Sequence, residues 1–170
     1  FTALITVGAF IRIPVPVVPF TLQFLFTTLA GLLLGGKNGA ISVGVYILLG
    51  LIGLPVFFFF CGIGYVFNPT FGYLIGFCAG AYLTGKIANA KPQPSFKRLL
   101  IACFSGLFAV YLFGMAYYSI ISNFYLGDPV GLWPLFLYGF ILAVPGDISL
   151  CILSSILAKR LIPLIQTDRM

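Results

Sequence analysis

The sequence predicts an all-α integral membrane protein, a six-transmembrane-helix bundle in a single domain over residues 1–170. Three observations predict this class: an apolar composition, six apolar segments, and basic residues that gather in alternate connections. Hydrophobic residues make up 61% of the chain, charged residues make up 7%, and the mean hydropathy is +1.16. A soluble domain carries charge on about a quarter of its residues, so the surface of this chain is expected to face lipid.

The six apolar segments follow one another with short connections, divided where proline, glycine and charge gather. Their approximate bounds are 1–11, 20–35, 39–53, 73–89, 97–122 and 135–161. The second and third are shorter than the roughly 20 residues that cross a bilayer alone. They must either tilt little or leave irregular, protein-covered backbone at membrane depth, which is typical of a binding cavity. The last segment is interrupted by Pro145-Gly146, which predicts a kink. The chain begins with Phe1 inside an apolar segment, so we expect its N-terminus to be incomplete.

The basic residues predict the orientation of the bundle. With a cytoplasmic N-terminus, only Arg12 lies outside, and the other eight basic residues lie inside. These eight are Lys37, Lys86, Lys91, Lys97, Arg98, Lys159, Arg160 and Arg169. Lys and Arg are retained on the cytoplasmic side of membrane proteins, so we expect a multi-pass protein with both termini in the cytoplasm. The net charge of +6 is thereby explained without a nucleic-acid partner.

Three connections then lie outside, at residues 12–19, 54–72 and 123–134. The first is rich in proline, and the second contains four consecutive phenylalanines followed by glycines and an Asn-Pro pair. We interpret these connections as a lid over a cavity. The alternative is ordinary short connectors with interfacial aromatic residues.

Glycines recur at four-residue steps in two of the segments: Gly31 and Gly35, and Gly72, Gly76 and Gly80. This spacing lets helices approach closely in lipid. Packing within the bundle is the favoured reading, and docking on another subunit is the alternative.

Asp147 is the main candidate for a functional site, because it lies near the middle of the sixth segment. A carboxylate at that depth is costly unless it faces partners or water; a structural hydrogen bond or protonation is the alternative. Neutral polar residues occur beside aromatic ones at the expected outer side: Thr21, Gln23, Asn68 and Thr70. Together they are expected to line an apolar pocket with a few placed polar groups.

Catalysis, metals and cofactors have little support in the sequence. The chain has no histidine, no close pair of acids and no phosphate-binding loop, so it is predicted to be neither an enzyme nor an ATPase. The four cysteines lack metal-binding or redox spacing and are interpreted as small apolar residues. Any energy that the function needs must therefore come from elsewhere.

Five blocks of the sequence resemble the BioY family, the biotin-specific S components of energy-coupling-factor (ECF) vitamin importers. They are Pro14–Gln23, Ala30–Gly35, Tyr46–Phe57, Asn68–Phe77 and Pro145–Asp147. The blocks keep their order over nearly the whole chain, and the Pro-Phe-Thr-Leu-Gln and Asn-Pro-Thr-x-Gly-Tyr-Leu motifs are the most specific.

The resemblance implies a prokaryotic membrane subunit that captures biotin from outside and binds no cofactor. It also implies two kinds of partner, a transmembrane coupling protein (EcfT type) and two ATP-binding subunits. Asn68, Tyr73 and Asp147 match positions expected to line the biotin pocket, and phenylalanines such as Phe57 would contact the apolar ring and tail.

One position departs from the family pattern, since Leu150 stands where a lysine is expected three residues after Asp147. The carboxylate of biotin would then need another base, and Arg12 is our candidate; a role as an interfacial anchor is the alternative. A different carboxylate vitamin, such as lipoate, would also explain the change.

Two other classes stay open from the sequence. A self-sufficient transporter or channel would carry its substrate without partners, and an intramembrane enzyme would have to act with one aspartate and no partner base. A purely structural subunit is the least attractive reading.

Overall fold

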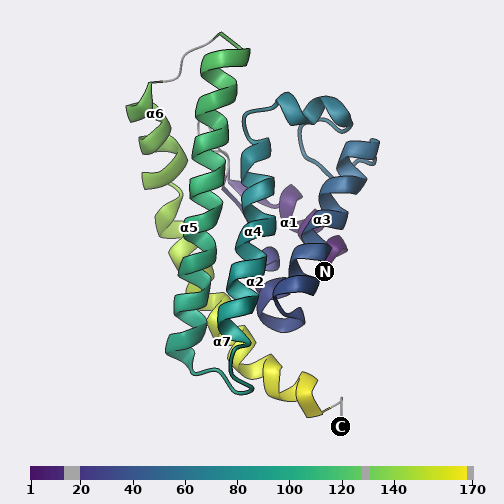
Figure 1. The fold of residues 1–170 in the computed structure, drawn as a ribbon, viewed down its shortest axis with the longest axis vertical. Helices are drawn as coiled ribbons and strands as arrows, with labels where there is room; N and C mark the ends of the chain where they lie inside the picture. The colour runs from purple at the N-terminus through teal and green to yellow at the C-terminus, as the bar shows by residue number, and fades with distance from the viewer. Residues whose placement is uncertain (14–19, 128–130, 168–170) are drawn as a thin grey trace.

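The computed structural model describes residues 1–13, 20–127 and 131–167 (Figure 1). Three parts of the chain named in the predictions lie outside the described residues: residues 14–19 of the first connection, residues 128–130 of the third, and Arg169. The described helices are α1 (Thr2–Phe10), α2 (Gln23–Leu34), α3 (Gly36–Ile52), α4 (Phe71–Ala88), α5 (Phe96–Ile120), α6 (Leu132–Phe136) and α7 (Val144–Thr167). A 3₁₀-helix, η1 (Ile63–Phe67), precedes α4, and the π-helical turns η2 (Ile121–Tyr125) and η3 (Leu137–Ile141) follow α5 and α6. Two short strands, β1 (Arg12–Ile13) and β2 (Phe20–Thr21), pair antiparallel.

In the described ranges, these elements form six helical segments, because η2 continues α5, and α6, η3 and α7 follow one another along one path. Two segments, Phe96–Tyr125 and Trp133–Ile165, are long and apolar enough to cross a membrane, while α2 and α3 are shorter apolar helices. The short second and third helices expected from the sequence are therefore present. Irregular backbone is present in residues 53–70 between α3 and α4, at one end of the bundle (Figure 1). That irregular backbone lies covered at membrane depth stays a prediction.

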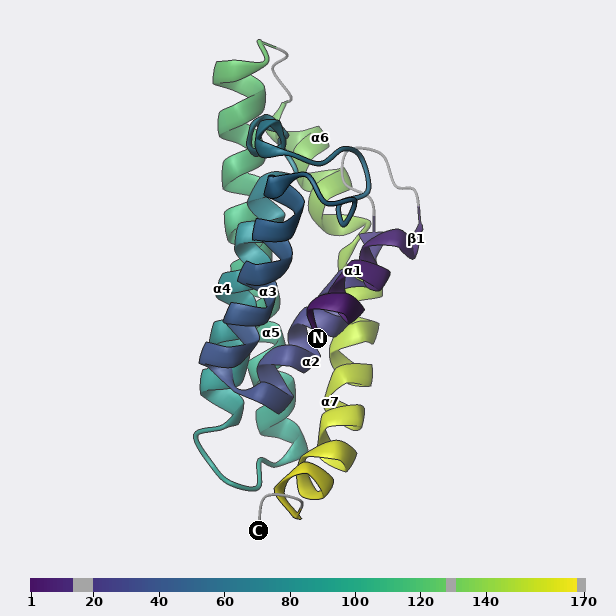
Figure 2. The same cartoon turned by 90° about the vertical axis from the view of Figure 1, so that its right-hand side faces the viewer.

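The helices are arranged so that α3, α4 and α5 lie on one side of the bundle and α7 on the other, with α1 and α2 between them (Figure 2). The connection between α4 and α5 lies at the same end of the bundle as the end of α7 (Figure 1). Residues 53–70, which follow α3, and η2, which follows α5, lie at the opposite end. Two basic side chains hold the first end together: Arg98 Nε donates to Ile87 O at 2.8 Å, and Lys159 Nζ donates to Pro94 O at 3.1 Å.

The glycines of α4 bring its backbone directly against α5. A Cβ added to Gly76 would lie 2.8 Å from Val110 Cα, and one added to Gly80 would lie 2.9 Å from Gly106 O. Gly31 of α2 meets the backbone of α4 in the same way. Packing of the glycine faces within the bundle is thus confirmed, as expected for small residues that let helices approach closely.

The last helical path is irregular just before Pro145, rather than at it. Residues 137–141 form π-helical turns, two turn residues follow, and α7 begins at Val144. A proline ring clashes with the carbonyl four residues earlier, here that of Ile141, whereas in the first turn of a helix its missing N–H needs no partner. The predicted interruption therefore takes the form of a new helix start, which places Asp147 in the first turn of α7.

Candidate binding cavity

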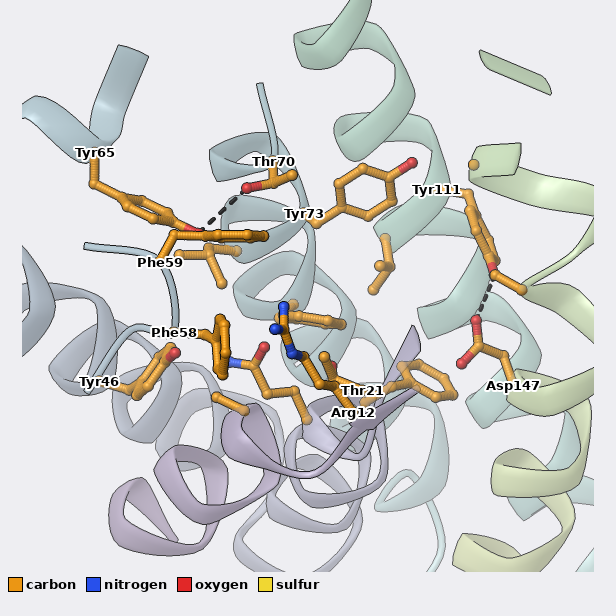
Figure 3. Close-up of a pocket in the computed structure, with 18 residues that line it drawn as sticks. Arg12, Thr21, Tyr46, Phe58, Phe59, Tyr65, Thr70, Tyr73, Tyr111 and Asp147 are labelled. Atoms are coloured by element: carbon orange, nitrogen blue, oxygen red, sulfur yellow. Dashed lines mark hydrogen bonds between the residues drawn. The ribbon is translucent and has the colours of Figure 1, made fainter. Parts of the chain in front are cut away.

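A cavity lies between the helices where α1, α2, α4, α5 and α7 meet the segment between α3 and α4 (Figure 3). Its empty space is about 840 Å³, which includes solvent at its open side. Most of its wall is apolar or aromatic, with a few polar groups, as in small-molecule sites generally. The lining residues are Ala9, Arg12, Thr21, Gln23, Phe24, Tyr46, Phe58, Phe59, Tyr65, Thr70, Tyr73, Leu74, Phe77, Val110, Tyr111, Gly139, Ala143 and Asp147.

Asp147 provides a buried carboxylate at one side of the cavity. It is 8% exposed, and its Oδ2 accepts a hydrogen bond from the Tyr111 hydroxyl. Its place in the first turn of α7 is favourable, because the N-terminus of a helix carries partial positive charge. The second carboxylate oxygen points away from Tyr111, toward the side of the cavity where Arg12 lies (Figure 3). This oxygen is therefore available to accept a hydrogen bond from a ligand.

Tyr73 also lines the cavity, and its hydroxyl has no partner among the described residues. The hydroxyl is buried, and the Tyr73 ring packs edge to face on Tyr111 with centroids 6.5 Å apart. Gln23, the first residue of α2, is 7% exposed; its Nε2 makes no hydrogen bond of ordinary geometry in the described part of the chain, although its side chain lies near the Tyr46 hydroxyl. A buried polar group without a partner costs roughly 1–3 kcal/mol. A ligand or a water molecule in the cavity can satisfy such groups.

Arg12 lies on another part of the wall, on β1. Its guanidinium carbon is 3.3 Å from the centroid of the Phe58 ring and 5.7 Å from that of Phe59. Asp147 is the only acidic residue in the described ranges, and its hydrogen bond is with Tyr111. The positive charge of Arg12 is therefore stabilised by cation–π interactions with Phe58 and Phe59.

Asn68 does not line the cavity in the described structure, although Thr70 does. The Asn68 Oδ1 accepts hydrogen bonds from Thr70 N at 2.9 Å and from Thr70 Oγ1 at 2.7 Å. Thr70 Oγ1 in turn lies 3.3 Å from the Tyr65 hydroxyl. Asn68 therefore stabilises the turn that leads into α4, two residues before the N-cap Thr70, and this turn positions Thr70 and Tyr65 at the wall.

Phe57 also lies behind the wall rather than on it, within the described residues. It is 4% exposed and packs on Tyr46 and Tyr65, with ring centroids 5.3 and 4.5 Å away. The Tyr46 hydroxyl donates to Val56 O at 3.2 Å. Phe57 thereby anchors the segment whose next two residues, Phe58 and Phe59, reach the cavity.

Leu150, where the family resemblance led us to expect lysine, is buried in the core at 7% exposure and is absent from the described wall. The structure brings Arg12, Gln23, Thr70, Tyr73 and Asp147 together around one space.

Sequence reasoning missed Tyr111, Tyr46 and Tyr65 as wall residues. Tyr111 lies in the middle of an apolar helix, where its hydroxyl was a signal that a polar partner must be nearby. Tyr46 and Tyr65 gave no comparable signal.

The bundle of apolar helices and the largely apolar cavity within it are those of a membrane transport component. The chain belongs to the BioY family, whose sequence model matches residues 1–167. It is 44% identical over 169 residues to a protein named probable biotin transporter BioY from Lysinibacillus sphaericus, covering 99% of this chain and 86% of that protein. It is 41% identical over 162 residues to the biotin transporter BioY of Thermotoga maritima, covering 95% of this chain and 90% of that protein.

The fold is similar to a solved structure, the S component for biotin from an ECF-type ABC transporter. The TM-score is 0.78 at 32% identity, and the match covers 94% of this chain and 85% of the other. The family predicted from the five sequence blocks and the predicted six-helix fold class are both confirmed.

Proposed function

We propose that this chain is the biotin-binding S component of an ECF-type ABC importer, and that the cavity holds biotin. The observation that carries the proposal is the buried Asp147 carboxylate, with one oxygen taken by Tyr111 and the other facing the cavity. The relatives named as biotin transporters and the solved S component for biotin support the choice of ligand.

The ureido ring of biotin has two N–H donors and one carbonyl acceptor. In this proposal, the free oxygen of Asp147 accepts a hydrogen bond from a ureido N–H, and a neutral donor of the cavity wall, such as Gln23 Nε2, serves the ureido carbonyl. The apolar sulfur ring and tail pack on the aromatic wall. A dithiolane ring, as in lipoate, has no N–H to offer Asp147, so the polar groups favour biotin over lipoate.

The orientation and the partners are part of the same proposal. The connection between α4 and α5 and the end of α7 carry most of the basic residues and lie at one end of the bundle, which we place in the cytoplasm. Biotin would then enter from the opposite end, where the segment between α3 and α4 lies. Because the sequence has no phosphate-binding loop, the coupling protein and two ATP-binding subunits supply the energy, and Asn68 and Phe57 act by shaping the wall.

Uptake of tritiated biotin into liposomes tests the proposal. The purified chain alone should bind biotin without accumulating it, and ATP-dependent uptake should appear only when the coupling module is added. Accumulation of biotin by the chain alone would instead establish a self-sufficient transporter.

A further inference from the structure

Arg12 stands out as the only basic residue among those that line the described cavity. It lies on β1, directly opposite Thr21 of β2, and Thr21 also lines the cavity. Its side chain is partly exposed and lies against the rings of Phe58 and Phe59 (Figure 3). The cavity therefore has a carboxylate on one side and an arginine elsewhere on its wall.

The Phe58 ring fixes the direction in which Arg12 can bind a ligand. Stacking at 3.3 Å covers one face of the guanidinium, while its N–H donors lie in the plane of the group and stay available at its edges. A planar fork of donors matches a carboxylate, which can accept two parallel hydrogen bonds. An ester or an amide at the same position lacks the charge and the second equivalent acceptor.

We propose that Arg12, held by Phe58, is the receptor for the terminal carboxylate of the ligand and selects the free acid over its esters and amides. This inference rests on the proposed function, because it concerns the far end of the same ligand. In that pose, the ureido ring lies toward Asp147 and the carboxylate toward Arg12. The Arg12 guanidinium then needs no acidic side chain as a partner, because the ligand provides the carboxylate.

Two features of the chain support this assignment over an anchoring role at the membrane surface. First, Arg12 stacks on rings that themselves line the cavity. Second, Leu150, one turn beyond Asp147, is buried in the core and provides no charge.

Binding of three ligands by calorimetry tests the assignment: biotin, biotin methyl ester and biotinamide. Wild type should bind biotin about 10- to 100-fold more tightly than either neutral analogue, since hydrogen bonds to charged groups are stronger than neutral ones. Arg12→Gln should lose this preference and bind all three alike, and Arg12→Lys should keep part of it. Phe58→Leu should reduce the preference, because the guanidinium loses its platform.

The matched control is Lys86→Gln. Lys86 also lies over an aromatic ring, that of Tyr82 at 5.8 Å, but is absent from the described wall of the cavity. This variant should keep the preference of wild type for the free acid.

The failures of the inference and of the proposed function are distinguishable. If wild type binds biotin and the analogues equally, or if Arg12→Gln keeps the full preference, the role of Arg12 is overturned and biotin binding stands. If wild type binds none of the three, the proposed function fails and the inference fails with it. If Arg12→Gln does not fold, Arg12→Lys and Phe58→Leu still test the assignment, and full preference in both would overturn the role of Arg12.

Discussion

Replacing Asp147 with asparagine changes one buried carboxylate into an amide of the same shape. In wild type, Tyr111 occupies Oδ2 and leaves one oxygen for the ligand. In Asp147→Asn, the single carbonyl oxygen can serve Tyr111 or the ligand, and the NH₂ group would face a ligand N–H with another donor. The substitution therefore removes a charged hydrogen bond without opening a hole in the core.

The expected loss follows from the value of that bond. A hydrogen bond to a charged group contributes about 1.5–3 kcal/mol, which corresponds to a Kd for biotin roughly 10- to 150-fold weaker. Tyr111→Phe should weaken binding less, since the carboxylate keeps its charge. A double-mutant cycle between the two sites should show coupling, because the two side chains are in direct contact.

The assay is equilibrium binding of tritiated biotin to the detergent-purified variants, with thermal unfolding of the ligand-free proteins measured in parallel. Ser149→Ala is the matched control, because Ser149 lies two residues away on α7 but is exposed and bonds only to Pro145 O among the described residues. It should bind biotin like wild type. Unchanged affinity in a folded Asp147→Asn would refute the reasoning.

Three further substitutions test the packing around the cavity. Gly76→Ala should lower the free energy of unfolding by roughly 1–3 kcal/mol through overpacking. Its control, Gly44→Ala, has open space at the Cβ position and should be neutral or slightly stabilising. Equal thermal stabilities of the two variants would contradict the tight α4–α5 contact. Asn68→Ala should cost roughly 0.5–1.5 kcal/mol through the lost turn hydrogen bonds and should weaken binding. Asn68→Asp should restore both, because it keeps the acceptor. If aspartate binds as poorly as alanine, Asn68 acts through its amide. Phe57→Ala should lower the free energy of unfolding by roughly 3–5 kcal/mol. Ile63→Ala, at a site that is 80% exposed, should have little effect on unfolding in detergent. A small loss for Phe57→Ala would show that the segment is not anchored at Phe57.

The fold was predictable because its signals are local. Apolar runs, the proline at residue 145 and the glycine steps each constrain the nearby backbone, whatever the rest of the chain does. The exact start of α7 was not predicted, since the sequence alone does not show whether a proline kinks a helix or begins a new one.

The cavity was only partly predictable. Asp147 is conspicuous as an acid in an apolar run, but Tyr111, 36 residues earlier, resembles any aromatic core residue until the packing of α5 on α7 is known. Among the four consecutive phenylalanines, no periodicity distinguishes the anchor Phe57 from the wall residues Phe58 and Phe59. Asn68 shows a similar limit, because an asparagine before a helix is equally suited to bind a ligand or to cap a turn.

The central claim is that this cavity binds biotin, and calorimetric titration of the purified chain with biotin, and separately with lipoate, tests it most directly. We predict saturable binding of biotin and a rise in thermal stability through mass action, with lipoate much weaker. Binding of lipoate alone, or of neither compound, would contradict the claim.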